Sequence, residues 1–139
     1  DEIRRFGVGY CNIDQPRLPH CPGPSAIATS DVGYVRFHGR RADTWFARNI
    51  PSFERYNYLY SSAELHAWRP RIEQLGSECQ EVYIFANNHY RGQAPANALQ
   101  LHALVHDSKI EVPRPLLDHY PELADIHRPA ADSVPDTLF

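Results

Sequence analysis

The chain has 139 residues, a formal net charge of −3, 42% hydrophobic residues and 12% aromatic residues. This length fits one domain with a sizeable core, and the composition excludes a disordered chain. The negative charge excludes the strongly basic surface that is typical of many nucleic-acid-binding domains. No window approaches the roughly 18 consecutive apolar residues of a membrane span, and the N-terminus lacks a secretion-signal pattern. We therefore expect a cytoplasmic protein without membrane contact, in which the three cysteines stay reduced.

Three segments indicate buried β-strands. Phe6–Asp14 is a short apolar run with little polar alternation, Val32–Arg40 is rich in β-forming residues, and Glu81–Ala86 runs directly into a polar loop. Alternation along the second segment places Arg36 and His38 on the same face of the strand. Each of the three segments ends close to polar or charged residues, so we expect the chemistry of the protein at these strand ends.

Two helices are expected between and after these strands. Ser61 and Glu64 have the spacing of a capping box, and a stripe of apolar residues behind them predicts a helix from about residue 62 to 75. Pro70 lies inside this helix and should kink it. A second helix is predicted over about residues 95–106, with Pro95 in its first turn. Strands that alternate with helices in this order predict a parallel sheet with right-handed crossover connections.

Two long segments show no clear periodicity. The loop from Arg41 to Leu59 is nearly 20 residues long and rich in aromatic residues, which is typical of a functional loop. After residue 110, prolines recur every few residues and predict an extended tail with frayed ends, apart from a short turn around Leu116–Tyr120. We therefore divide the chain into a folded part, residues 1–110, and a proline-rich C-terminal tail, residues 111–139.

Three sequence blocks resemble a known family. They are Tyr34–Arg40 (YVRFHGR), Arg55–Trp68 (RYNYLYS followed by Glu64, Leu65 and Trp68) and Phe85–Ala98 (FANNHYRGQAPANA). Their order and spacing resemble the YecE-like proteins, which are also called domain of unknown function 72. Asn12–Pro16 is similar to an earlier strand end of the family. The chain departs from the family pattern at Asn57 and Pro70.

The resemblance implies a TIM-type (β/α)8 barrel. Such a barrel needs roughly 250 residues, whereas this chain has 139. The resemblance therefore implies the C-terminal half of a barrel, in which the three predicted strands are the last three. Both edges of such a sheet are open, which invites pairing with another strand. We expect a fragment of a longer protein, because Asp1 begins abruptly before a strand, and assembly with another chain is the alternative.

In a barrel, these strand ends meet at the C-terminal face, where phosphate sites are frequent. We expect Asp14, His38 and His89 to act as catalytic acid and base, or to bind one divalent metal ion together. The expected ligand-binding residues are Arg36, Gly39, Arg40, Tyr56, Asn87, Asn88, Arg91, Gly92 and Asn97. The charges would bind an anion, and the glycines would allow close backbone approach.

Each of these expectations has a purely structural alternative. Arg36 can pair with an acidic residue elsewhere in a barrel, Asn87 and Asn88 can cap their own loop, and the tyrosine-rich loop can be a packed lid. Two functional hypotheses follow. The first is a hydrolase or nuclease-like enzyme that acts on a phosphate-containing substrate, including nucleic acid. The second is a barrel without catalytic activity that binds an anionic ligand or a partner through the same face. The sequence assures no cofactor and leaves a divalent metal ion open.

Overall fold

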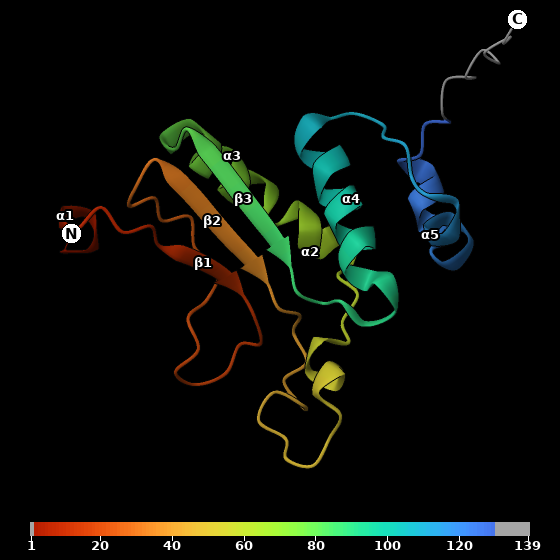
Figure 1. The fold of residues 1–139 in the computed structure, drawn as a ribbon, viewed down its shortest axis with the longest axis horizontal. Helices are drawn as coiled ribbons and strands as arrows, with labels where there is room; N and C mark the ends of the chain where they lie inside the picture. Colours follow the sequence, from red (N-terminus) through yellow and green to blue (C-terminus); the bar gives the residue numbers. More distant parts are fainter. Residues whose placement is uncertain (1, 130–139) are drawn as a thin grey trace, which may run out of the picture.

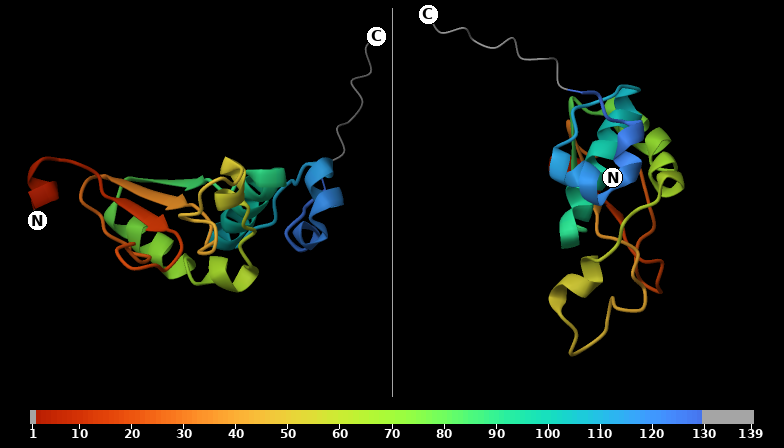
Figure 2. Two further views of the ribbon diagram at one scale, coloured as in Figure 1. Left: turned by 90° about the horizontal axis from the view of Figure 1, so that it is seen from below. Right: turned by 90° about the vertical axis from the view of Figure 1, so that its right-hand side faces the viewer.

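The computed structural model describes residues 2–129, which form a parallel three-stranded sheet with helices on one side (Figures 1 and 2). The strands are β1 (Cys11–Asp14), β2 (Val32–Phe37) and β3 (Glu81–Ala86). The helices are α1 (Glu2–Arg5), α2 (Ser62–His66), α3 (Arg69–Glu78), α4 (Gln93–His106) and α5 (Arg114–His119), and the 3-10 helices are η1 (Ser52–Tyr56), η2 (Tyr90–Gly92) and η3 (Pro121–Asp125). None of the helices in residues 2–129 is long and apolar enough to cross a membrane.

The sheet has the order β1-β2-β3, and both strand pairs are parallel. One cross-strand row joins Ile13, Arg36 and Phe85, and the next joins Asp14, Phe37 and Ala86. This arrangement confirms the parallel α/β sheet that the alternation of strands and helices predicted. The first strand is shorter than expected, because the segment before Cys11 begins with α1 and then turns at Gly7, where φ is 63°.

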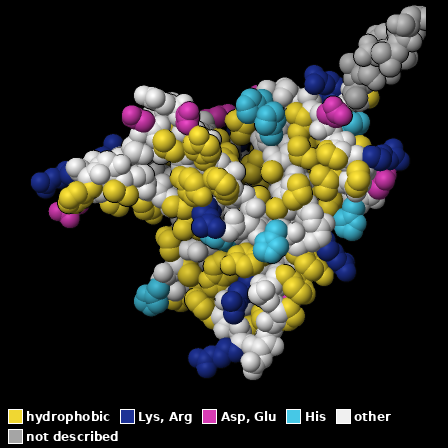
Figure 3. All heavy atoms as spheres, in the orientation of Figure 1, with side chains coloured by type: hydrophobic (Ala, Val, Ile, Leu, Met, Phe, Trp, Pro, Cys, Tyr) yellow, Lys and Arg dark blue, Asp and Glu magenta, His cyan; other side chains and the backbone are white. Residues whose placement is uncertain are grey.

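The two faces of the sheet have different environments. Val35 and Phe37 are buried on one face, where they pack with Leu65, Trp68 and other apolar residues of the helices. The other face bears no helix within residues 2–129 and carries Tyr34, Arg36, Tyr83 and Phe85. Hydrophobic side chains are gathered over this open face (Figure 3). Tyr83 is 48% exposed and Phe85 is 46% exposed, so the described residues leave an apolar sheet surface uncovered.

Pro70 divides the helix that we predicted over residues 62–75. The chain forms α2 and α3 instead, and Pro70 lies in the first turn of α3, where its missing N–H is tolerated. The predicted capping box is confirmed: the Ser61 hydroxyl accepts a hydrogen bond from the Glu64 backbone N–H, and the Glu64 carboxylate accepts one from the Ser61 N–H. The following helix continues through Gly76 to Glu78, which leaves a shorter connection to β3 than expected.

The segment after residue 110 is not the extended tail that we expected. Within the described residues it contains α5 and η3, and Val112, Tyr120 and Leu123 form a second apolar cluster with Ala96 of α4. Pro115 and Pro121 lie in the first turns of these two helices, so they begin the helices rather than prevent them. The rest of the predicted tail, residues 130–139, lies outside the described residues, and the division at residue 110 stays a prediction.

Candidate functional site

Four aromatic rings meet beyond the C-terminal end of β2. His38 follows β2, His89 lies in the loop between β3 and α4, and Tyr56 is the last residue of η1. The centroid of the Tyr56 ring lies 6.2 Å from that of His38 and 5.6 Å from that of His89. Trp45 adds a fourth ring, 6.1 Å from His38 and 6.4 Å from Tyr56. The structure thus brings together three of the residues that the sequence suggested and one aromatic residue that the prediction left out.

The loop from residue 41 to 59 is fixed to the β3–α4 loop. Phe53 stacks on Tyr90 with ring centroids 4.6 Å apart and an interplanar angle of 5°. The Gln93 side-chain amide donates a hydrogen bond to the Asn57 side-chain oxygen at 3.0 Å. In Figure 1 this loop projects beyond the ends of the strands, so it extends the molecule on the side where the rings meet.

The two histidines have different surroundings. Nδ1 of His89 lies 2.9 Å from the backbone oxygen of Asn87, and since a carbonyl oxygen only accepts, this nitrogen carries the proton. Nε2 of a neutral His89 is therefore a free acceptor. The pKa of His38 is lowered, chiefly by burial and then by the charge of Arg36, although Asp14 opposes this shift. Nδ1 of His38 is buried and has no hydrogen-bond partner within residues 2–129.

Arg36 provides positive charge on the same side. It lies on the open face of the sheet in the row between Ile13 and Phe85, two residues before His38. Its Nε is buried and has no hydrogen-bond partner, and no carboxylate within residues 2–129 forms an ion pair with it. Because a buried polar or charged group is costly without a partner, this guanidinium is suited to an external anion.

Asp14 and Arg40 lie in a different environment. The Asp14 carboxylate is fully buried. Asp14 pairs with Phe37 in the sheet, and the Phe37 ring packs against the helices, so Asp14 lies on the helix-covered face. It accepts hydrogen bonds from Arg40 Nε (2.8 Å) and Nη2 (2.6 Å), Tyr60 Oη (2.8 Å) and Trp68 Nε1 (2.6 Å). Arg40 also donates to Glu64 at 2.9 Å. We therefore revise their expected roles in catalysis and anion binding: these contacts join the strand ends to the helices.

Glu64 has two structural roles, of which the sequence predicted only the first. One carboxylate oxygen caps α2, while the other accepts hydrogen bonds from Arg40 and, at 2.6 Å, from Tyr58 Oη. Burial would raise the pKa of Glu64, but the hydrogen bonds from Tyr58 and Ser61 and the charge of Arg40 lower it overall. The capping-box pattern revealed the first role, whereas no local pattern reveals a bond to a residue 24 positions earlier in the chain.

The two expected ligand-binding glycines both have a positive φ, and Gly39 also allows close packing. Gly39 has φ 87°, its N–H donates to Tyr60 Oη at 2.8 Å, and a Cβ there would lie 2.7 Å from Cβ of Tyr58. Gly92 has φ 84°, and a Cβ there would meet Leu116 of α5 at 3.4 Å. The backbone conformation thus favours glycine at both positions, and the contact with Tyr58 further favours it at Gly39, whereas the distance at Gly92 is an ordinary van der Waals contact.

Two of the three expected asparagines have buried side chains that bond within the chain. Asn97 is buried, and its side chain accepts a hydrogen bond from the Tyr60 N–H and donates one to the Tyr60 oxygen. Asn88 is also buried and donates to Asn97 and to the Tyr58 oxygen, both at 2.8 Å. Both side chains hold the end of the long loop, so Asn88 has a structural role, although it does not cap its own loop as our structural alternative supposed. Asn87 contributes its backbone oxygen to orient His89.

Arg91 contacts the C-terminal segment through its backbone, and its side chain lies over the Tyr90 ring. Its backbone has a positive φ of 52°, and its oxygen accepts a hydrogen bond from Tyr120 Oη at 2.8 Å. Its guanidinium carbon lies 5.3 Å from the centroid of the Tyr90 ring. Arg40 donates its hydrogen bonds to Asp14 and Glu64 instead, so the contacts of these two arginines give no support to an anion site shared by them. Within residues 2–129, no group of three or more His, Cys, Asp or Glu side chains could hold a metal ion.

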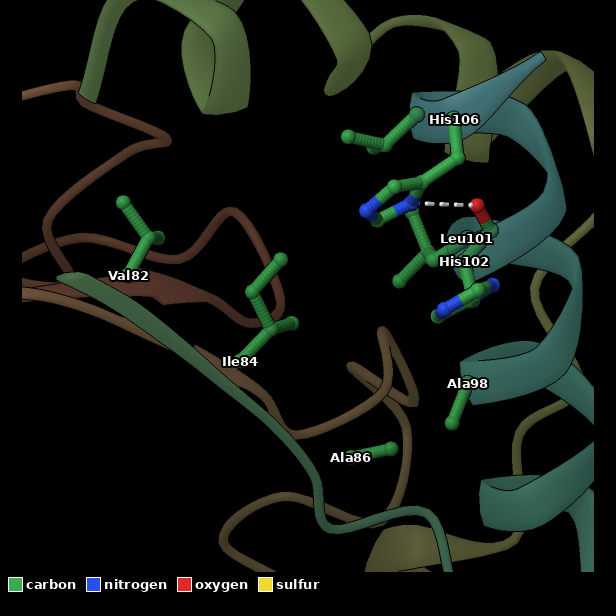
Figure 4. Close-up of a pocket in the computed structure, with 8 residues that line it drawn as sticks. Val82, Ile84, Ala86, Ala98, Leu101, His102 and His106 are labelled. Carbon is green, nitrogen blue, oxygen red and sulfur yellow. Dashed lines mark hydrogen bonds between the residues drawn. The ribbon is translucent and has the colours of Figure 1, made fainter. Parts of the chain in front are cut away.

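An apolar groove of about 250 Å³ lies away from these rings, between β3 and α4 (Figure 4). Val82, Ile84 and Ala86 of β3 form one wall, and residues of α4 that include Leu101 and Val105 form the other. β3 pairs only with β2 within the described residues, so this groove opens at a free sheet edge. Its lining is mostly apolar and also includes His102 and His106 of α4 (Figure 4).

The fold and the polar strand ends define an α/β domain with a candidate ligand site at the carboxyl ends of parallel strands. The family model described as "Protein of unknown function DUF72" matches residues 1–120, so the chain belongs to this family. This confirms the resemblance to the YecE-like proteins. A curated relative, the UPF0759 protein YunF of Bacillus subtilis (strain 168), is 30% identical over 94 residues, which are 63% of this chain and 33% of the relative.

Solved DUF72 structures share the fold. A DUF72 family protein from Thermotoga maritima MSB8 superposes with a TM-score of 0.69 at 38% identity, over 75% of this chain and 39% of that one. Two structures of a DUF72 family protein from Enterococcus faecalis V583 give TM-scores of 0.65 and 0.61 at 24% and 26% identity. They cover 80% and 75% of this chain and 40% and 39% of theirs. The chain thus spans less than half the length of these relatives.

Proposed function

We propose that the three strands form part of a (β/α)8 barrel whose open sheet face is the barrel interior. The parallel order of the strands, the helices restricted to one face and the exposed Tyr83 and Phe85 support this arrangement. The groove at the free edge of β3 would receive side chains of a neighbouring strand. The remaining strands would come from further sequence of a longer protein or from another chain.

We further propose that the ends of these strands bind a phosphate-containing ligand. The observation that carries this proposal is Arg36, whose buried Nε has no partner and whose charge has no carboxylate counterpart within residues 2–129. A planar guanidinium with free donors suits phosphate oxygens. His38 lies two residues further along the same face, so it would also face the bound anion.

Hydrolysis of the bound ester is the reaction that these groups support. Nε2 of His89 is a free acceptor and would take a proton from the attacking water. The lowered pKa of His38 keeps its ring neutral near pH 7, which suits hydrogen bonding to the phosphoryl group better than donation of a proton to the leaving group. Water would attack phosphorus and the ester oxygen would leave, protonated by solvent. A phosphodiester of nucleic acid is a second substrate of the same class.

The test separates binding from turnover. Phosphate binding should weaken about tenfold or more in Arg36→Gln, because a charge-assisted contact is lost. Arg71→Gln, on the helix layer beside Trp68, is the matched control and should bind phosphate normally. His89→Ala should retain phosphate binding and lose hydrolysis of p-nitrophenyl phosphate or of an oligonucleotide.

Two results would change this proposal. Binding of phosphate without turnover by the unaltered protein would leave a barrel that binds an anionic ligand without catalysis. Phosphate affinity that is the same in Arg36→Gln and in the unaltered protein would remove the anion site, and would favour pairing of Arg36 with an acidic residue elsewhere in the barrel.

A further inference from the structure

The two tryptophans of the chain have opposite environments. Trp68 is 0% exposed, its Nε1 donates to Asp14 at 2.6 Å, and its ring packs 5.0 Å from that of Phe37. Trp45 is only half-buried, and its indole N–H has no hydrogen-bond partner within residues 2–129. Buried tryptophans usually pair their N–H as Trp68 does. Trp45 is therefore not used as a core residue by the described part of the chain.

The backbone around Trp45 is nevertheless held in place. The Ala47 N–H donates to the Thr44 oxygen at 3.1 Å, so the chain turns tightly around Trp45. Arg55 Nη2 donates to the Ala47 oxygen at 3.0 Å, which ties this turn to η1. An aromatic side chain that is ordered before binding loses less conformational entropy when a ligand contacts it.

The ring arrangement leaves the indole unstacked. Its plane makes an angle of 69° with the His38 ring and 74° with the Tyr56 ring, so neither ring lies parallel to it. The neighbouring Phe46 is 73% exposed. A partly exposed aromatic surface thus borders His38, which we assign to the anion site.

We propose that Trp45 binds a planar aromatic group of the ligand by stacking, so that the substrate is a phosphate ester of an aromatic or heteroaromatic compound. This proposal rests on the proposed anion site. The phosphate would lie near Arg36 and His38, and the ring would lie on the indole. Stacking on an aromatic side chain tolerates different rings, because every such ring offers a π-face. Trp45 would therefore select the class of ligand rather than one compound.

The experiment compares phosphonates that cannot be hydrolysed as esters. At a pH at which both are dianions, phenylphosphonate should bind roughly tenfold more tightly than propylphosphonate, which has no ring. In Trp45→Leu this preference should disappear while the affinity for inorganic phosphate stays the same. Trp45→Phe keeps a stacking surface and should retain much of the preference. Phe6→Leu removes a more exposed ring from the N-terminal segment and should change nothing.

Fluorescence gives a second measurement on the unaltered protein. Trp68 is buried, so acrylamide should quench chiefly Trp45, and phenylphosphonate should protect Trp45 from quenching. This measurement decides the question even where Trp45→Leu fails to fold. Phosphate binding that depends on Arg36 but shows no preference for the phenyl compound would overturn the stacking role alone. A preference that persists in Trp45→Leu would also overturn it, whereas absence of any phosphate binding would remove the anion site itself.

Discussion

The carboxylate of Asp14 and the guanidinium of Arg40 form a two-bond ion pair, with Nε–Oδ1 and Nη2–Oδ2 distances of 2.8 and 2.6 Å. The pair joins the end of β1 to the segment that follows β2. The hydrogen bond to Asp14 is the main reason that the pKa of Arg40 is raised. Tyr60 and Trp68 donate to the same carboxylate, so one buried acid connects two strand ends to the helix layer.

Asp14→Asn should therefore destabilise the fold. The substitution removes the negative charge while Arg40 stays in place, and breaking a buried ion pair in this way costs about 3–5 kcal/mol. Urea denaturation should show a lower free energy of unfolding. Asp43→Asn removes an exposed partner of Arg41 and should leave the denaturation midpoint nearly unchanged. Equal midpoints for Asp14→Asn and the unaltered protein would contradict the structural role of Asp14.

Gly39→Ala should destabilise the protein by about 2 kcal/mol or more, because a positive φ and a clash add to each other. The new Cβ would lie 2.7 Å from Tyr58 Cβ, and this atom cannot move without its backbone. Gly76→Ala is the matched control. Gly76 lies inside α3 with nothing within 4 Å of its Cβ position, so alanine should stabilise this helix by about 0.5–1 kcal/mol. Thermal denaturation of the two variants should give shifts of opposite sign.

Local sequence patterns predicted the elements of this fold well, because they depend on neighbouring residues. The alternation around Arg36 and Phe37 predicted the two faces of β2, and the Ser61–Glu64 spacing predicted a helix start. Asp14 was assigned to the wrong surroundings because its face depends on the register between β1 and β2, and a slip of one residue exchanges the faces. No local pattern contains this register.

The C-terminal segment shows a second limit of such patterns. Its prolines were counted as breaks, whereas Pro115 and Pro121 occupy first turns of short helices. Whether a proline here breaks the chain or begins a helix is decided by burial of Tyr120 and Leu123 against α4, a contact between distant parts of the chain. The candidate site was predicted in the same uneven way: the histidines and Tyr56 come together, while most of the amide and glycine positions support the backbone.

The pKa of His38 should lie below its usual value of 6.5, because burial and then Arg36 disfavour the charged ring. The unfolded chain therefore binds the proton more readily than the folded one. His38 thus contributes fully to stability above pH 6.5, and this contribution is lost as the pH falls from 6.5 to its folded pKa. NMR titration of the imidazole should show the low midpoint directly. Arg36→Gln should raise the midpoint, Arg5→Gln should not, and a midpoint above 6.5 would contradict this arrangement.

The open face of the sheet should make residues 1–139 self-associate when they are produced alone. Tyr83 and Phe85 expose apolar rings on this face, and β3 has a free edge beside the apolar groove. Exposed apolar patches and unpaired edges both favour association. Sedimentation velocity should show assemblies whose size increases with concentration. A double substitution, Tyr83→Lys with Phe85→Lys, should shift the population toward monomer because it places two like charges on this face.

Phe46→Lys is the control for this prediction, because it removes a more exposed ring outside the sheet. It should leave the association unchanged. If the sheet face is the barrel interior, the same double substitution in a protein that contains the rest of the barrel should lower its stability instead, since two charges would then be buried. Association that is equally weakened by Phe46→Lys would place the contact on the long loop and would contradict a role of the sheet face.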